Sequence, residues 1–326
     1  MNKTQIIEDI HTLVSHNVIG DLQLMSRYKG FRGELFLNEL FKTKKDRELY
    51  EGGMIISTNK SAASSLDDAV YINIVDKAKY NDNYIEIFRL LSTLDFKSMY
   101  LIVYDTDYLI NTDVMIYEDE TIAFDIPKMD VKLYDLNTNS FSEANDGIVT
   151  ITNEFENQSK RNKNTYTITE DSKIWLIDEL SAFDENELYH LFMTRLILDG
   201  YIGFSKVKGK PSDIDLITKK NENFSLIEVK EKDLPKQAKK GFGLDVPRLK
   251  DFDRISKSTG LPYFLIVREV DNQTDRNFLG WKYINITDFI EDVKGEAEVE
   301  GGTGMRSSYS NNPTLICSYE KFQDIK

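Results

Sequence analysis

Cysteine, histidine, proline and tryptophan are all scarce in this chain of 326 residues. It holds one cysteine, Cys317, together with three histidines, six prolines and two tryptophans. A single cysteine excludes a disulfide within the chain and a zinc site built from several cysteines. The histidines, His11, His16 and His190, are too few to favour a histidine-rich metal centre. The chain is therefore not expected to use cysteine or histidine as its main metal-binding chemistry.

Long apolar runs are also missing. No stretch approaches the roughly 20 apolar residues that cross a bilayer, and residues 1–14 read as a charged amphipathic helix, unlike a signal peptide. Hydrophobic residues make up 40% of the chain and charged residues 29%, which is ordinary for a globular protein. We therefore expect a cytoplasmic protein of two domains, each long enough to bury its own core.

Several familiar catalytic motifs are absent as well. The glycines of residues 295–313 are not followed by Gly-Lys-Ser or Gly-Lys-Thr, so they do not form a phosphate loop. The chain has no dinucleotide fingerprint, no protein-kinase motif set and no Ser-His-Asp order. With these motifs absent, acidic and basic side chains are the remaining candidates for catalytic residues.

Residues 211–230 carry the densest group of such side chains. The segment PSDIDLITKKNENFSLIEVK reads as two apolar strands joined by a short polar turn. Asp213 and Asp215 are two residues apart in the first strand, and Glu228 and Lys230 are two apart in the second. Because side chains alternate between the faces of a strand, each pair points the same way, about 6–7 Å apart. In an antiparallel hairpin, Asp215, Glu228 and Lys230 would converge, and this set suits a hard metal ion and phosphodiester hydrolysis.

This pattern resembles the PD-(D/E)xK nucleases, the fold of restriction endonucleases and Holliday-junction resolvases. In that family an Asp at the end of one strand is followed, one hairpin later, by (D/E)-x-K. Here Asp215 is followed by Glu228-Val229-Lys230, in a form especially similar to the Mrr-type and resolvase-type branches. The resemblance implies that Asp215, Glu228 and the carbonyl of Val229 bind Mg²⁺, for which Mn²⁺ can substitute. It also implies that Lys230 supports the attacking water.

One departure from the family pattern leaves the choice of aspartate open. Ser212 separates Pro211 from Asp213, so the literal Pro-Asp pair is interrupted. Either Asp213 or Asp215 could be the metal ligand. We favour Asp215, because it lies inside the apolar strand, and Asp213 then becomes a second acid near the metal or the substrate. The competing interpretation of the whole segment is an ordinary hairpin with a surface Glu–Lys pair.

The segments around the hairpin follow the family's core order of helix, strand, strand, strand, helix, strand. Residues 184–200 have the spacing of an amphipathic helix, and residues 201–204 are expected to form a strand. After the hairpin, residues 246–260 predict a second helix and residues 261–267 a buried strand. Because family members often add an acid from the first helix, Glu187 is a candidate third metal ligand or a neighbour of the metal.

The charge distribution favours nucleic acid as the partner. The net charge is −14, yet residues 201–260 hold 14 Lys and Arg against 9 Asp and Glu. A basic excess beside the hairpin is where phosphate would bind, although a solvated charged loop explains it equally well. The expected nucleic-acid-binding residues are Lys206, Lys208, Lys210, Lys232, Lys236, Lys239, Lys240 and Arg248.

The expected fold class is α/β, with a restriction-endonuclease-like C-terminal core made of a mixed sheet flanked by helices. Residues 1–150 are expected to form an α/β recognition or dimerisation domain, residues 151–166 a linker, and residues 167–326 the nuclease domain with a C-terminal extension. The N-terminal half echoes the C-terminal half, which suggests either a degenerate copy of the same fold or another α/β domain. In a degenerate copy, Glu34 and Asp68 would occupy former site positions.

By resemblance, the expected function is metal-dependent cleavage of DNA, in restriction or in defence against foreign DNA. Double-stranded DNA is the expected substrate and a homodimer the expected assembly. Two alternatives remain: a non-catalytic DNA-binding or scaffold protein of the same fold, and a nuclease that acts on RNA or single strands. Exposed aromatic residues, with Phe204, Phe242 and Tyr263 as candidates, would favour unpaired bases.

Overall fold

The computed structural model describes residues 2–18, 20–117, 120–155, 168–203, 209, 211–234, 240–272, 274–300 and 313–325. The chain forms two compact units, each built from two segments. The first unit contains Met1–Tyr28 and Gly53–Asp213, and the second contains Lys29–Gly52 and Ile214–Lys326. Across the described ranges, no helix is both long enough and apolar enough to span a membrane.

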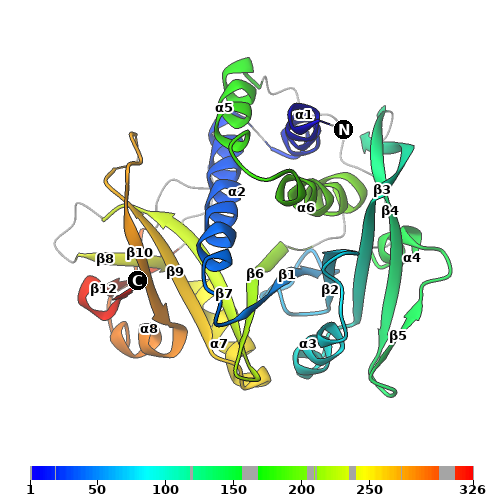
Figure 1. Ribbon diagram of the computed structural model, residues 1–326. Coiled ribbons are helices and arrows are strands. Elements are labelled where there is room, and N and C mark those ends of the chain that lie inside the picture. Colours follow the sequence, from blue (N-terminus) through cyan, green and yellow to red (C-terminus); the bar gives the residue numbers. More distant parts are fainter. Residues whose placement is uncertain are drawn as a thin grey trace. The chain divides into compact units, whose positions relative to one another are not determined.

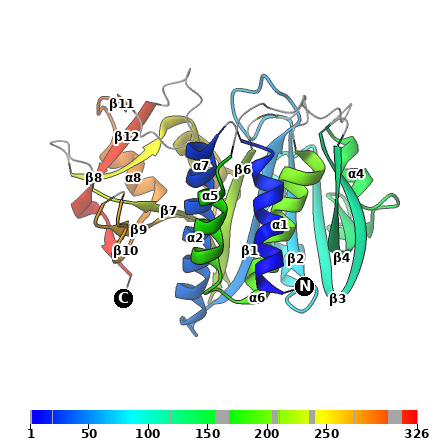
Figure 2. The same ribbon diagram turned by 90° about the horizontal axis from the view of Figure 1, so that it is seen from above.

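The first unit is a mixed sheet with helices. Its strand order is β1-β2-β3-β4-β5, with β2 parallel to β3 and the other neighbours antiparallel. Figure 2 shows β3 and β4 side by side as a long hairpin. The elements are α1 (Lys3–Ser15), β2 (Ala69–Asp76), α3 (Asn83–Leu91), η1 (Ser92–Leu94), β3 (Ser98–Tyr117), β4 (Glu120–Asp135), β5 (Ser140–Glu143), α4 (Ile148–Asn153), α5 (Glu170–Leu180), α6 (Glu185–Arg195) and the π-helix η2 (Leu196–Ile202).

The second unit is built around strand β7, which pairs antiparallel with β6 and parallel with β9 (Figure 1). Its strand order is β13-β10-β9-β7-β6-β1, and β11-β12-β8 form a separate antiparallel sheet. The elements are α2 (Asp21–Lys42), β1 (Glu48–Ser57), β6 (Pro211–Lys220), β7 (Asn223–Lys232), β8 (Gly241–Asp245), α7 (Val246–Thr259), β9 (Tyr263–Val270), β10 (Phe278–Asn285), α8 (Ile286–Asp292), β11 (Val299–Glu300), β12 (Pro313–Ser318), η3 (Tyr319–Lys321) and β13 (Gln323–Asp324). The unit boundaries fall inside α2, β1 and β6.

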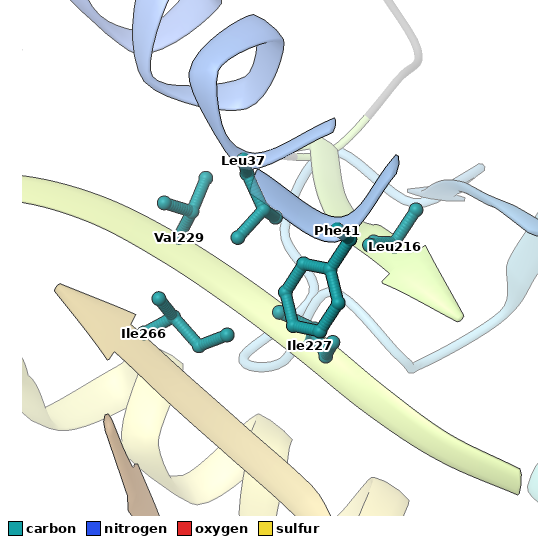
Figure 3. Close-up of a cluster of buried hydrophobic side chains, with 6 residues drawn as sticks. All are labelled: Leu37, Phe41, Leu216, Ile227, Val229 and Ile266. Atoms are coloured by element: carbon teal, nitrogen blue, oxygen red, sulfur yellow. The ribbon is translucent and has the colours of Figure 1, made fainter. Parts of the chain in front are cut away.

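The buried core of the second unit joins helix α2 to three strands. Its residues, drawn in Figure 3, are Leu37, Phe41, Leu216, Ile227, Val229 and Ile266. Leu37 and Phe41 are four residues apart and therefore share one side of the helix. In β7, Ile227 and Val229 alternate with the charged Glu228, so the apolar face of the strand packs on α2 and Glu228 points to the opposite face.

Local signals account for the hairpin and for the helix that follows it. Strands β6 and β7 are joined by Asn221 and Glu222, whose φ angles are 49° and 65°. Two consecutive positive φ values are typical of the tight turn that suits a twisted hairpin. Helix α7 has Pro247 in its first turn and ends at Gly260, whose φ of 69° is left-handed.

The prediction of a strand at residues 201–204 is wrong for the part that the structure describes. Helix α6 continues as a π-helix through Leu196–Ile202. Gly200 lies so close to α1 and β3 that a Cβ atom there would be 3.1 Å from a Leu13 carbon and 3.3 Å from a Val114 carbon. The apolar side chains of this segment are buried in that packing, and tertiary packing outweighs the local strand pattern.

The expected domain boundaries do not coincide with the two units. Residues 168–203, expected in the nuclease domain, lie in the first unit, where α6 packs on α1 and β2. Residues 29–52, expected in the N-terminal domain, lie in the second unit. Most of the expected linker, residues 156–166, is outside the described part of the chain. The α/β fold with a large mixed sheet flanked by helices is confirmed.

Candidate active site

Asp215 lies where strands β6 and β7 separate. The two strands pair from Lys220↔Asn223 to Leu216↔Ile227, and the pairing stops before Asp215. Its Oδ2 accepts a hydrogen bond of 2.6 Å from the backbone N–H of Val229. A carboxylate therefore replaces the backbone partner that continued pairing would supply, and it is held against β7 beside Glu228.

Strand β6 also runs close to β1 at this point. A Cβ atom at Gly52 would lie 1.7 Å from the carbonyl oxygen of Ile214, so only glycine fits there. This close approach fixes the path of β6 at the residue directly before Asp215.

Three acids lie together at this place in the chain. Glu34, Asp213 and Asp215 each offer a carboxylate oxygen, and these oxygens all lie within 4.8 Å of one another. Glu34 belongs to α2, and Asp213 and Asp215 belong to β6. All three are partly buried. Carboxylates this close repel one another unless a cation or a proton intervenes.

The spacing of these oxygens suits a hard divalent ion. Mg²⁺ and Ca²⁺ bind oxygen at about 2.0–2.6 Å, so ligands across one ion are up to roughly 4–5 Å apart. The three oxygens fall inside that limit. The donor set is oxygen alone, which is the set that Mg²⁺ and Mn²⁺ accept.

Glu228 and Lys230 form a second group on β7. Glu228 is fully buried, and its Oε1 accepts a hydrogen bond of 2.6 Å from Arg248 Nη1 on α7. Lys230 Nζ also contacts Oε1. The second oxygen, Oε2, is buried and has no hydrogen-bond partner among the described residues. A buried carboxylate oxygen without a partner is costly, so this atom marks a place where a ligand would be stabilising.

The predicted pair of metal ligands, Asp215 and Glu228, is thus divided between two adjacent groups. Asp215 joins Glu34 and Asp213, whereas Glu228 is held by Lys230 and Arg248. The hydrogen bond from Val229 to Asp215 links the groups, because Val229 is next to Glu228. The Val229 side chain is buried in the core, and its carbonyl remains a predicted ligand.

Lys232 lies on the same face of β7 as Glu228 and Lys230, because the three residues alternate along the strand. Partial burial, together with the positive charge of Lys230, lowers the pKa of Lys232 to about 8, and Asp245 opposes that shift. Arg248 is partly exposed and lies over the ring of Phe252 at 5.8 Å. Cationic side chains therefore gather along this face.

Of the remaining predicted nucleic-acid-binding residues, the structure describes only Lys240. Lys240 is exposed, and its backbone carbonyl accepts a hydrogen bond from Tyr319 N. Five lysines lie outside the described residues: Lys206, Lys208, Lys210, Lys236 and Lys239.

The helix residue in the acidic group is Glu34, and the expected Glu187 is not part of it. Glu187 is buried at 4% exposure on α6 in the first unit and is not in the acidic group. Glu34 lies on α2, in a segment whose apolar spacing predicted a helix. Both α2 and α6 have helical spacing in the sequence. The sequence could not show which of the two helices lies beside β6 and β7, because that depends on tertiary packing.

Two of the three aromatic residues proposed to line the site are in the core. Phe242 is 1% exposed and Tyr263 is 0% exposed, and Tyr263 stacks on Phe252 at 4.5 Å. Phe204 lies outside the described residues. Their burial removes Phe242 and Tyr263 as platforms for unpaired bases.

Comparison with protein-family models, with curated proteins and with solved structures finds no match for this chain. The chemistry of the site therefore has to be inferred from its own residues and geometry.

Proposed function

We propose that the chain is a metal-dependent nuclease of the PD-(D/E)xK type that hydrolyses phosphodiester bonds in DNA. The observation that carries the proposal is the group of Glu34, Asp213 and Asp215 at the point where β6 leaves β7. Lys230 and the buried Glu228 follow on the adjacent strand. Acidic oxygen ligands beside a lysine suit the cleavage of a phosphodiester.

The order of elements in the second unit supports the same proposal. Apart from β8, which belongs to the separate sheet, helix α2 and strand β1 are followed by β6, β7, α7 and β9. This is the order of helix, strand, strand, strand, helix, strand expected for the family. Residues 53–213 enter as an insertion between the first and second strands of that order. The helix acid, the strand acid and the E-x-K triplet then come from α2, β6 and β7 of this order.

Glu34, Asp213 and Asp215 are the residues that would hold the metal, and Glu228 Oε2 is a further oxygen next to them along β7. Bound Mg²⁺, or Mn²⁺ in its place, supplies a Lewis acid that polarises the phosphate and lowers the pKa of water. The chain's own part is to orient these oxygens: Val229 N–H fixes Asp215, and Arg248 fixes Glu228.

Lys230 and its cationic neighbours act on the phosphate. The Lys230 ammonium is partly exposed and is held beside Glu228, so it can donate to a phosphate oxygen or to a water at the site. Arg248 and Lys232 place further positive charge on this face. Such charge stabilises the negative charge that develops as the phosphodiester is cleaved.

The biological setting rests on the resemblance alone. We propose a cytoplasmic enzyme of restriction or defence against foreign DNA, which acts on duplex DNA as a homodimer with one site per strand. A non-catalytic DNA-binding or scaffold protein of the same fold would keep the two groups of charged side chains but would not cleave.

The test is a cleavage assay with purified protein on supercoiled plasmid, linear duplex, single-stranded DNA and RNA, in Mg²⁺, in Mn²⁺ and in EDTA. We expect cleavage of DNA with either metal and none in EDTA. Cleavage of RNA alone would establish the ribonuclease alternative. Binding without cleavage of any substrate would establish the scaffold alternative.

A further inference from the structure

A cluster of cations surrounds one buried glutamate at the end of β7. The Glu231 side chain is 3% exposed and accepts hydrogen bonds from Arg32 Nη2 at 2.8 Å, Arg268 Nη1 at 2.6 Å and Arg276 Nε at 2.5 Å. Lys29 lies three residues before Arg32 on α2 and therefore shares its side of the helix. Burial and the charges of Arg276 and Arg32 lower the pKa of Lys29, whereas Glu231 opposes the shift. Three arginines thus bind a single carboxylate, with Lys29 next to one of them on the helix.

Among the described residues, three acids of β9 and of the β9–β10 loop accept hydrogen bonds from other donors. Asp271 accepts hydrogen bonds from Asn272 and Asn277 within the β9–β10 loop, and Asp275 accepts one from Asn272. Glu269 accepts a hydrogen bond from Tyr319 and alternates with Arg268 on β9, so it points to the opposite face. Among these described contacts the cations outnumber the carboxylates, and such an excess favours an anion at the surface.

An aromatic surface lies directly over the cluster. The Arg268 guanidinium lies 4.3 Å from the ring centre of Phe36 and 4.9 Å from that of Phe278. Phe278 is nevertheless 48% exposed, and its neighbour Leu279 is 60% exposed. The β9–β10 register shifts between Phe278 and Gly280, and a bulge of this kind redirects side chains. Phe278 thus lies against a cation and against the ring of Trp281, 5.9 Å away between ring centres, while nearly half of the residue stays exposed to solvent.

We propose that Phe278 and Lys29 bind an unpaired nucleotide of a nucleic-acid strand, with the base stacked on Phe278 and a phosphate held by Lys29. Stacking on an aromatic ring beside a cationic surface is how single strands are bound without sequence preference. Glu231 follows Lys230 on β7 but points to the opposite face of the strand, and Arg32 precedes Glu34 by two residues on α2. The inference rests on the proposed function and specifies it further: the DNA substrate is a duplex that also carries unpaired bases.

The test is fluorescence anisotropy of the full-length protein in EDTA, where cleavage is not expected. The probes are a fluorescein-labelled deoxythymidine oligomer and its duplex with the complementary strand. Phe278→Ala should weaken binding of the single strand by about 5- to 100-fold, from the usual energy of one base stack, and leave the duplex unchanged. Leu279→Ala, the exposed neighbour, is the matched control and should bind as the wild type does.

Two further variants separate stacking from folding. Phe278→Trp keeps an aromatic face and should bind the single strand like the wild type. Phe278→Leu keeps an apolar cover over Arg268 without an aromatic face, so it should bind as weakly as Phe278→Ala. Lys29→Gln should reduce the slope of log affinity against log salt by about 0.7, the contribution of one phosphate of a single strand.

The outcomes that overturn the inference are distinct from those that overturn the nuclease proposal. Single-strand binding that is absent in the wild type, unchanged in Phe278→Ala, or weakened equally for the duplex would refute the stacking surface. Displacement of the oligomer by an equal concentration of deoxythymidine monophosphate would assign the surface to a free nucleotide. A protein that shows the Phe278 effect but cleaves nothing would retain the surface and lose the nuclease assignment.

Discussion

Two glutamates of strand β7 with buried side chains lie three residues apart and differ in their hydrogen-bond partners. Both oxygens of Glu231 accept hydrogen bonds from arginines that come from α2, β9 and the β9–β10 loop. Glu228 uses one oxygen for Lys230 and Arg248, and its other oxygen is buried without a hydrogen-bond partner in the described structure. Glu231 therefore links three segments of the chain, whereas Glu228 keeps one oxygen that a ligand can contact.

The partners of the two glutamates differ in the same sense. The arginines on Glu231 have side chains that are 10% exposed or less, whereas Lys230 is 32% and Arg248 24% exposed. Cations at the surface can turn to solvent when their carboxylate is removed, and buried ones cannot. Loss of Glu231 should therefore act on stability, and loss of Glu228 on activity.

The largest expected effect is the loss of cleavage on substitution of Glu228 or Lys230. Glu228→Gln and Lys230→Ala should each reduce the single-turnover cleavage rate by about 10²–10⁴-fold, because a positioned proton donor or carboxylate contributes that much. Lys220→Ala, which removes an exposed lysine of β6, is the control and should cleave normally. Full activity in both site variants would remove the E-x-K triplet from the proposed site.

The next effect is on stability. Glu231→Gln should lower the free energy of unfolding by about 3–5 kcal/mol, measured by urea denaturation, because it leaves buried arginines without their carboxylate. Burial opposes the ionisation of Glu231, but Arg276 and Arg32 outweigh it and hold its pKa below the ordinary value. Its stabilising contribution is therefore present above the unfolded pKa of about 4.3 and is lost as the pH falls through the folded pKa.

Two other glutamate variants serve as controls for the predicted loss of stability in Glu231→Gln. Glu222→Gln changes a carboxylate that is 87% exposed and should alter stability by no more than about 0.5 kcal/mol. Glu228→Gln should destabilise less than Glu231→Gln. An equal loss in both buried variants would mean that the two carboxylates have the same structural role.

A smaller effect is expected on metal affinity. Asp215→Asn and Glu34→Gln should each weaken Mn²⁺ binding by about 10- to 100-fold in calorimetry, a loss typical of altered metal surroundings. Asp213→Asn should weaken it less, since Asp215 alone is fixed by Val229 N–H. Glu39→Gln, at an exposed position of the same helix, is the control for Glu34. If Asp213→Asn loses metal and Asp215→Asn does not, the assignment of the strand acid is wrong by two residues.

The smallest effect concerns Lys232, whose pKa is lowered to about 8. Between this value and the unfolded pKa of about 10.4, the unfolded chain binds more protons than the folded chain, so stability rises with pH. Lys232→Met should therefore be more stable than the wild type by about 1–2 kcal/mol at pH 7, and this gain should disappear towards pH 10. A gain in stability that stays constant from pH 7 to pH 10 would mean that apolar packing of the Met side chain, and not loss of the charge, is its cause.

Local sequence signals were sufficient for the elements that carry the E-x-K triplet. The alternation in 211–230 predicted the β6–β7 hairpin, and the predicted segments 246–260 and 261–267 correspond to α7 and β9. Each of these depends on contacts between near neighbours in the chain, such as the positive φ angles at Asn221 and Glu222. A pattern of alternation or of helical spacing records such contacts directly.

The origin of the first helix could not be predicted in the same way. Residues 21–42 and 185–195 both have helical spacing, and their local sequence does not determine which of the two helices covers β7. The choice is made by Leu37 and Phe41 packing on residues nearly two hundred positions later in the chain, such as Ile227. The sequence suggested Glu34 only as a former site position of a degenerate copy, and the fold is what brings it to Asp213 and Asp215.

The most direct measurement of the central claim is single-turnover cleavage of plasmid DNA by four proteins in Mg²⁺ and in EDTA. The proteins are the wild type, Asp215→Asn, Glu34→Gln and the control Asp253→Asn, whose carboxylate pairs with Lys257 on α7. We expect cleavage by the wild type and by Asp253→Asn in Mg²⁺ alone, and little or none by the other two. Undiminished cleavage by Asp215→Asn and Glu34→Gln, or cleavage that persists in EDTA, would contradict a metal-dependent site at these acids.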